Sequence, residues 1–171
     1  MSLGLRIFLP FAGGYLLSYL LRNFNAVVAP ELTRELGLSA ADLGLLTSAY
    51  LLAFAAFQLP LGVLMDRYGP RRVQSVLLLV TAAGCALFAL GTGITQLTIA
   101  RAAIGLGVSG CLMSSFTTFS RAFATERLPS LNAAVMVAGG VGALAATTPL
   151  AWVMPMTGWR PLMLALSALS A

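Results

Sequence analysis

Long apolar runs with few charged residues dominate this sequence and restrict what it can fold into. A helix needs about 20 apolar residues to cross a hydrocarbon core of ~30 Å. Six runs stand out, at residues 7–28, 43–63, 73–90, 97–120, 130–154 and 162–171. The first five are long enough to cross, whereas the sixth gives only ~15 Å of helix. We therefore predict an all-α integral membrane protein, a single helical bundle of five full transmembrane helices and a truncated sixth.

The composition excludes a water-soluble globule. Of the 171 residues, 59% are hydrophobic and 9% are charged, against roughly 25% charged in a soluble domain. The basic residues are all Arg and lie mostly between the apolar runs, where the positive-inside bias places them, so the net charge of +5 predicts no nucleic-acid partner. The sequence has no His, which excludes Ser-His catalysis and His-ligated zinc. We expect no enzyme activity, cofactor or metal.

The positions of the charges predict an orientation in the membrane. Arg residues gather before the first run, after the second and after the fourth, namely at Arg6, at Arg67, Arg71 and Arg72, and at Arg121 and Arg127. These three places alternate correctly to share one side, and the positive-inside rule makes that side cytoplasmic. We expect a bacterial-type cytoplasmic (inner) membrane protein with its N-terminus in the cytoplasm.

The connection between the second and third runs carries the most specific pattern, GVLMDRYGPRR at residues 62–72. We expect Gly62 to let two backbones approach closely, and Gly69 with Pro70 to reverse the chain. A compact cluster of opposite charges follows at the membrane surface, formed by Asp66, Arg67, Arg71 and Arg72. A positive-inside loop with a turn explains the Arg residues and the Gly-Pro pair, but not Asp66 or the spacing of the whole pattern.

This connection resembles motif A of the major facilitator superfamily, G-x-L-x-D-R-x-G-x-R-R. Every defined position is met, by Gly62, Leu64, Asp66, Arg67, Gly69, Arg71 and Arg72. The resemblance implies the N-terminal six-helix half of a two-half transporter, with its partner, the C-terminal half, absent from this sequence. In that family the motif is a conformational latch, whose Asp faces a helix N-terminus of the other half, where the helix dipole favours an anion.

The fourth run contains a second pattern of the same family. Arg101, Gly105 and Gly107 give R-x-x-x-G-x-G, which resembles motif B. The stretch at residues 105–110 also satisfies the G-x-G-x-x-G of dinucleotide sites, but such a site requires a strand before the glycines. Inside a continuous apolar run, small residues for close helix packing are the better interpretation.

Two arginines inside the apolar runs are the strongest candidates for function. An Arg at the centre of a membrane helix costs about 2.5–3.5 kcal/mol on insertion scales, so it normally faces a cavity or a partner. Arg22 and Arg101 lie ~12 Å and ~9 Å from the same side of the membrane, hence at similar depth. Snorkelling of either side chain to the headgroups remains an alternative.

Arg22 belongs to a polar stripe on the first helix. Tyr15, Ser18, Tyr19, Arg22 and Asn25 or Ala26 follow i, i+3 and i+4 spacing, which places them on one face. Such a stripe lines either a wet cavity or a helix interface. In the superfamily, the first and fourth helices border the central cavity, which favours the cavity.

The residues around Arg22 also resemble one group within the superfamily. Tyr19-Leu20-Leu21-Arg22, followed by Pro30, looks like helix 1 of the anion:cation symporters and related organic-anion carriers, where an Arg at this place contacts an anionic substrate. Those carriers often have an acid where this chain has Leu21, so we expect no proton coupling from this half.

The resemblance implies a secondary transporter that moves a small, anionic solute across a lipid bilayer by alternating access, with Tyr15, Tyr19, Arg22 and Arg101 as substrate-binding residues. Arg suits carboxylate or phosphate because its planar fork donates two parallel hydrogen bonds. Two alternatives stay open. One is a neutral or drug-like solute, and the other is a non-transporting membrane module or a half-transporter that needs a partner half.

Overall fold

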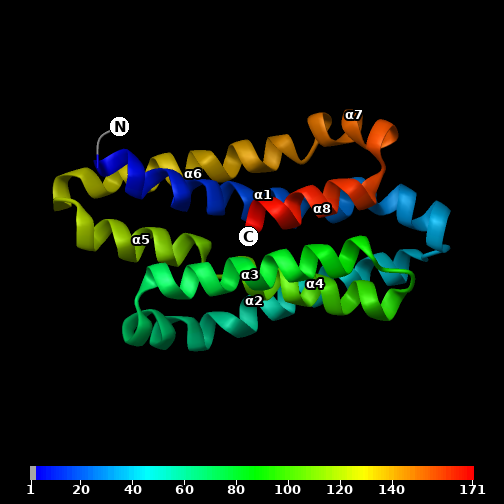
Figure 1. Cartoon of the computed structure of the whole chain (residues 1–171), viewed down its shortest axis with the longest axis horizontal. Helices are drawn as coiled ribbons and strands as arrows, with labels where there is room; N and C mark the ends of the chain where they lie inside the picture. Colours follow the sequence, from blue (N-terminus) through cyan, green and yellow to red (C-terminus); the bar gives the residue numbers. More distant parts are fainter. Residues whose placement is uncertain (1–2) are drawn as a thin grey trace.

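The computed structural model describes residues 3–171, and every regular element in that range is a helix (Figure 1). In chain order the helices are α1 (Leu3–Leu36), α2 (Ala40–Tyr68), α3 (Pro70–Ala89), α4 (Ile94–Val108), α5 (Cys111–Ala122), the 3-10 turn η1 (Thr125–Arg127), α6 (Leu128–Ala145), α7 (Thr148–Thr157) and α8 (Trp159–Ser170). Five helical segments of the described chain are long and apolar enough to cross a membrane. The all-α membrane prediction is therefore confirmed.

Two of the predicted runs are interrupted in the structure. The run at 97–120 divides into α4 and α5 at Ser109 and Gly110, and the run at 130–154 divides into α6 and α7 at Ala146 and Thr147. A Gly/Ser pair is a common site of a helix kink. At the second break, Pro149 lacks an N–H and crowds the residues before it. Hydropathy continues unchanged across both breaks, so the apolar runs alone gave no sign of them.

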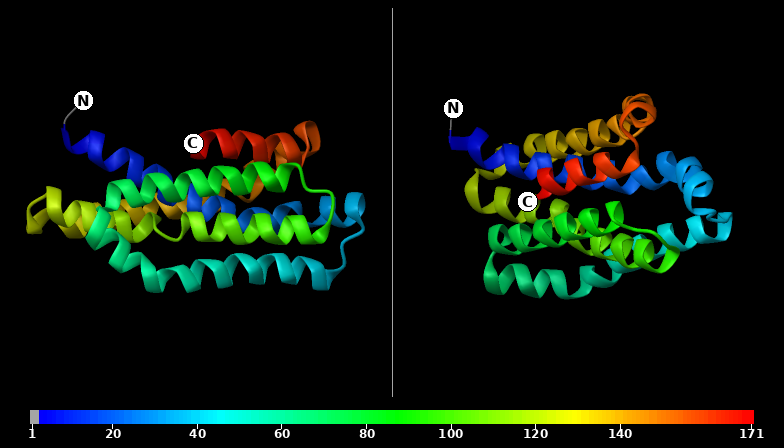
Figure 2. Two further views of the ribbon diagram at one scale, coloured as in Figure 1. Left: turned by 60° about the horizontal axis from the view of Figure 1, so that its bottom comes forward. Right: turned by 45° about the vertical axis from the view of Figure 1, so that its right-hand side comes forward.

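The helices form a bundle in which distant parts of the chain lie side by side. The most extensive contacts join α3 with α4, α1 with α6, α2 with α4, and α3 with α8. In Figures 1 and 2, α1 runs along α6, while α2, α3 and α4 lie together on the other side of the bundle. Helix α1 also contacts α2, α4 and α5.

Glycines allow the closest of these helix contacts. A Cβ atom at Gly105 of α4 would overlap the backbone of Tyr50 in α2, and one at Gly107 would overlap Thr81 in α3. A Cβ atom at Gly142 of α6 would overlap the backbone of Leu16 in α1. Small residues let helices approach where lipid supplies no hydrophobic drive between them. Gly105 and Gly107 thus lie at helix contacts rather than at a nucleotide loop.

The outside of the bundle is strongly apolar. Large side chains such as Leu59, Trp152 and Met156 are 86%, 76% and 89% exposed. Soluble monomers rarely expose large contiguous apolar patches, whereas lipid tails or another helical bundle would cover them. This surface fits an integral membrane protein.

The connection from α2 to α3 is a tight reversal, as its sequence predicts. Gly69 has φ of 84° and donates its N–H to Met65 O at 2.9 Å, and Pro70 begins α3. One expectation for this segment is not met in the bundle. A Cβ atom at Gly62 would have no neighbour within 4 Å in the described chain, so Gly62 makes no close backbone contact here. Its side of α2 faces outward.

Candidate functional site

The polar face of α1 lines a cavity of about 300 Å³, which we call the tyrosine cavity. Tyr15, Ser18, Tyr19 and Arg22 come from α1, because positions 15, 18, 19 and 22 share one face of a helix. Helix α2, the break between α4 and α5, and α5 itself close the cavity with residues that include Phe54, Gln58, Ser109 and Phe116. The structure therefore brings Tyr15, Tyr19 and Arg22 together, as the stripe suggested.

The two tyrosines of this cavity are held against each other. Tyr15 Oη lies 3.3 Å from Tyr19 Oη, and the two rings meet edge to face with centroids 5.0 Å apart. Gly139 of α6 leaves room for the Tyr15 ring, since a Cβ atom there would lie 2.6 Å from Tyr15 Cε1. The Tyr15 side chain is buried, so helix packing fixes its position at the cavity wall.

Arg22 lies between aromatic faces and has no acidic partner. Its guanidinium carbon is 5.1 Å from the Tyr19 ring centroid and 5.0 Å from the Phe54 ring centroid, distances that suit cation–π attraction. Its Nε is buried without a hydrogen-bond partner, and none of the ion pairs within residues 3–171 involves Arg22. The charge is thus positioned but not neutralised, which leaves N–H donors for an anion.

Arg101 occupies a different place from the other three predicted residues. It is 1% exposed, donates Nη1–H to Leu21 O at 3.0 Å, and lies 4.7 Å from the Tyr50 ring centroid. It does not line the tyrosine cavity. Instead Arg22 and Arg101 both line a neighbouring cavity of about 430 Å³ between α1, α2 and α4, which we call the two-arginine cavity. The burial of Arg101 excludes snorkelling of its side chain in this structure, while the guanidinium of the half-buried Arg22 lies between the Tyr19 and Phe54 rings.

The sequence did not predict the residues of the tyrosine cavity that lie outside α1, among them Phe54 and Gln58. Phe54 and Gln58 lie one turn apart on α2, and Gln58 Nε2 donates to Ser109 O at 3.1 Å, at the break between α4 and α5. The sequence does contain a signal for Gln58, because placing a side-chain amide in the membrane interior is unfavourable, as placing an Arg there is. Nothing in the sequence marked Phe54.

The motif A residues lie at one end of the bundle. Asp66 pairs with Arg121 of α5 at 4.0 Å, and both side chains are more than half exposed, so the contact is weak. Arg67, Arg71 and Arg72 are also exposed and form no ion pair within residues 3–171. The predicted cluster of opposite charges is therefore looser than expected, with the Asp directed to α5 rather than to its own loop.

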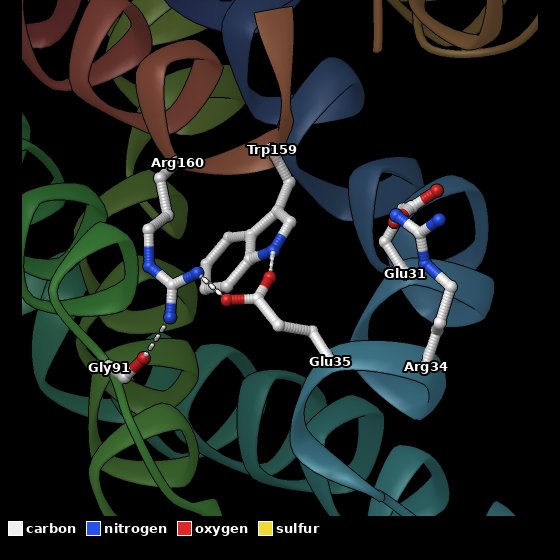
Figure 3. A network of polar contacts seen from close by, with 6 residues as sticks. All are labelled: Glu31, Arg34, Glu35, Gly91, Trp159 and Arg160. Carbon is white, nitrogen blue, oxygen red and sulfur yellow. Dashed lines mark hydrogen bonds and ion pairs between the residues drawn. The ribbon is translucent and has the colours of Figure 1, made fainter. Parts of the chain in front are cut away.

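A polar network fastens the opposite end (Figure 3). Trp159 Nε1 donates to Glu35 Oε2 at 2.6 Å, and Arg160 pairs with Glu35 Oε1 and donates to Gly91 O at 3.1 Å. The Arg160 guanidinium carbon also lies 4.2 Å from the Trp159 ring centroid. The network joins the end of α1, the α3–α4 connection and the start of α8, and so fixes the helix α1 that carries the cavity residues.

The family model described as Major Facilitator Superfamily matches residues 11–171. The chain belongs to the Major Facilitator Superfamily. Among solved structures, the inward-open xylose transporter XylE from E. coli matches 94% of this chain and 44% of that chain, with a TM-score of 0.70 and 20% identity. At that identity the likeness establishes the fold alone.

Two curated relatives are similar in sequence. "Probable sulfoacetate transporter SauU" of Cupriavidus necator is 33% identical over 109 residues, 64% of this chain and 24% of that protein. "4-hydroxybenzoate transporter PcaK" of Pseudomonas aeruginosa is 33% identical over 138 residues, 80% of this chain and 31% of that protein. The chain thus spans about a quarter to a third of the length of these relatives.

Proposed function

We propose that this chain forms the N-terminal helical half of a secondary transporter that moves a small organic anion across a bilayer by alternating access. The proposal of an anionic substrate rests on Arg22. Its guanidinium lies between the Tyr19 and Phe54 rings, and no Asp or Glu is among the described residues that line this cavity. An Arg in a membrane bundle normally pairs with a charge, a carbonyl or a substrate.

The similar proteins support the same class of substrate. Sulfoacetate and 4-hydroxybenzoate, the compounds in the names of the two relatives, are small organic acids. A carboxylate or sulfonate can accept two parallel N–H bonds from the fork of Arg22, and the Tyr15 and Tyr19 hydroxyls lie in the same cavity for further hydrogen bonds. In this proposal Arg22 holds the acid group, and the tyrosines orient the remainder.

The proposal needs a second helical bundle. The xylose transporter matches over 44% of its chain, which supports placing residues 3–171 in one half of a two-half carrier. Rocking of two such halves around a midplane site is the general mode of these transporters. Gly62, Asp66 and Arg67 are exposed at the motif A end of the bundle. In this proposal that surface meets the other half as a latch, on the cytoplasmic side of a bacterial-type inner membrane.

Uptake by variants of Arg22 tests the substrate proposal. The complete product of the gene that encodes this chain is expressed in cells, and uptake of labelled 4-hydroxybenzoate and sulfoacetate is measured. Hydrogen bonds to a charged group contribute about 1.5–3 kcal/mol, so Arg22→Gln should lower apparent affinity about 10- to 150-fold. Arg22→Lys keeps the charge without the fork and should be impaired to a smaller extent.

A matched control lies on the same helix. Arg34 is 79% exposed in its side chain and pairs with Glu31 one turn away, so Arg34→Gln should leave uptake unchanged at equal membrane levels. Uptake that survives Arg22→Gln would refute the anion clamp. Equal uptake of 4-hydroxybenzamide and 4-hydroxybenzoate would favour a neutral solute instead, because these two compounds differ in charge at the same position.

A further inference from the structure

The two-arginine cavity is a separate feature from the tyrosine cavity, although Arg22 borders both. It is lined by Arg22, Asn25, Thr47, Tyr50 and Arg101, which come from α1, α2 and α4. Close packing of Gly105 against the backbone of Tyr50 brings α2 and α4 together beside it. Three helices therefore hold the walls of this cavity.

The electrostatics of the cavity are one-sided. Two of its lining residues are arginines, and none is Asp or Glu. Arg101 is 1% exposed and its only hydrogen bond within the described chain goes to a neutral carbonyl, Leu21 O. A buried cation without a compensating anion is strongly unfavourable. The charge balance of this cavity calls for an anion.

Unpartnered hydrogen-bonding atoms point to the same conclusion. Within residues 3–171, Arg101 Nε is buried and has no hydrogen-bond partner, and the buried Tyr50 Oη has only the Arg22 guanidinium near it. Both groups can donate, and leaving such buried donors unsatisfied is unfavourable. Tyr50 and Arg101 are both 1% exposed, so bulk solvent does not satisfy them. Asn25 Oδ1 is also unpartnered within the described chain and can accept from a hydroxyl or hydrating water that accompanies an anion.

We propose that the two-arginine cavity is a second anion-binding site, in which Arg101, Tyr50 and the Nε edge of Arg22 bind a small anion. Arg22 can serve both cavities, because a guanidinium carries five N–H donors and one bidentate carboxylate uses two. The anion is either a free inorganic ion such as chloride or the second acid group of a solute whose first acid group lies in the tyrosine cavity. Binding of a free ion does not depend on transport, whereas binding of a second acid group rests on the proposed function.

Thermal unfolding of the complete gene product in detergent measures this binding directly. A ligand that binds only the folded state raises the unfolding midpoint with the logarithm of its concentration. Sodium chloride is titrated first, and sodium acetate is then compared with sodium malonate at equal sodium concentration. Tyr50→Phe and Arg101→Gln remove donors from the cavity. Tyr50→Phe removes only the hydroxyl and keeps the ring that the Arg101 guanidinium contacts, so it remains informative should Arg101→Gln fail to fold.

Two results support the site and identify the source of the anion. A chloride-dependent rise of about 1–3 °C per tenfold concentration, reduced at least by half in Tyr50→Phe and Arg101→Gln, indicates a free anion. A rise with malonate beyond that with acetate, without a chloride effect and lost in the same variants, indicates a second acid group. In either case Arg101→Lys should retain more of the rise than Arg101→Gln, because it keeps the charge.

Other results overturn the site. General salt effects act on every variant alike, with Arg34→Gln as the control for an exposed arginine on α1. A midpoint that no anion changes, or a rise of the same size in wild type, Tyr50→Phe and Arg101→Gln, would refute the proposal. Anion binding that persists while uptake of organic acids is absent would contradict the transport function only.

Discussion

The contact between α1 and α6 gives a sharp test of the packing that positions Arg22. Gly142 of α6 meets the backbone of Leu16 in α1, whereas Gly140, two residues earlier on the same helix, has nothing within 4 Å of a Cβ position in the described chain. Gly142→Ala and Gly140→Ala therefore add the same methyl group to one helix, once at a contact and once in open space.

The size of the effect follows from the geometry. A Cβ atom at position 142 would lie 2.9 Å from Leu16 C and 3.0 Å from Leu16 Cα, and would overlap Leu16 O. Carbon atoms normally pack at about 3.5–4.0 Å, and the overlap with Leu16 O is larger than that with the two carbons, so α1 and α6 must separate by roughly 1 Å. Backbone cannot rotate aside as a side chain can, and overpacking of this kind costs about 1–3 kcal/mol. Ala is a better helix former than Gly by up to ~1 kcal/mol, so Gly140→Ala should be neutral or stabilising.

The assay is equilibrium unfolding of the complete gene product in mixed micelles, followed by circular dichroism. We expect Gly142→Ala to lower the free energy of unfolding by about 1–3 kcal/mol. Gly140→Ala should not lower it. Uptake should fall with Gly142→Ala as well, because α1 carries Arg22. Equal stability of the wild type and Gly142→Ala would refute the α1–α6 packing, and equal losses in both variants would show that the space at Gly140 is not open.

Two further predictions concern the ends of the bundle. Gly69 has φ of 84° and ψ of 147°, a conformation open essentially to glycine, so Gly69→Ala should destabilise the protein by about 1–3 kcal/mol. Gly93 has φ of −156° and open space around its Cβ position, so Gly93→Ala should not destabilise it. Similar unfolding midpoints for the two variants would contradict the strain argument. Glu35→Gln removes the charge that holds Trp159 and Arg160, and since the ion pair is partly exposed we expect a loss of ~1 kcal/mol. Hydrogen exchange in residues 159–170 should then be about fivefold faster. Glu31→Gln is the control, because the partner of Glu31, Arg34, is on the same helix. Equal exchange rates of residues 159–170 in the two variants would exclude a role for the network in docking α8.

Several parts of the site could be derived from residue patterns. The spacing of Tyr15, Tyr19 and Arg22 on α1 placed them on one face, and the structure puts that face on a cavity. The Gly69–Pro70 reversal is likewise present. These inferences were accessible because they depend on residues close together in the chain, where helix geometry and turn chemistry act locally.

Other parts required the fold. Arg101 had the same insertion-cost argument as Arg22, yet it turns away from the tyrosine cavity to Leu21 O and Tyr50. The Asp66 partner is Arg121, from a helix far along the chain, rather than an Arg of its own loop. Each of these contacts depends on which helices are neighbours and how they are rotated, and neither is encoded by local spacing.

The sequence by itself determined that the chain is a set of membrane helices, because lipid leaves the backbone no hydrogen-bond partner outside its own helix and long apolar runs can adopt no other structure there. It also determined the family through the motif A pattern. Only the tertiary structure decided where the helices touch, where they break and how α1, α2, α4 and α5 border the tyrosine cavity and the two-arginine cavity. Apolar residues cover most of the surface of these helices, so hydropathy alone does not fix how each helix is rotated. Close packing between residues far apart in the chain, such as Gly142 with Leu16 and Gly105 with Tyr50, contributes to it.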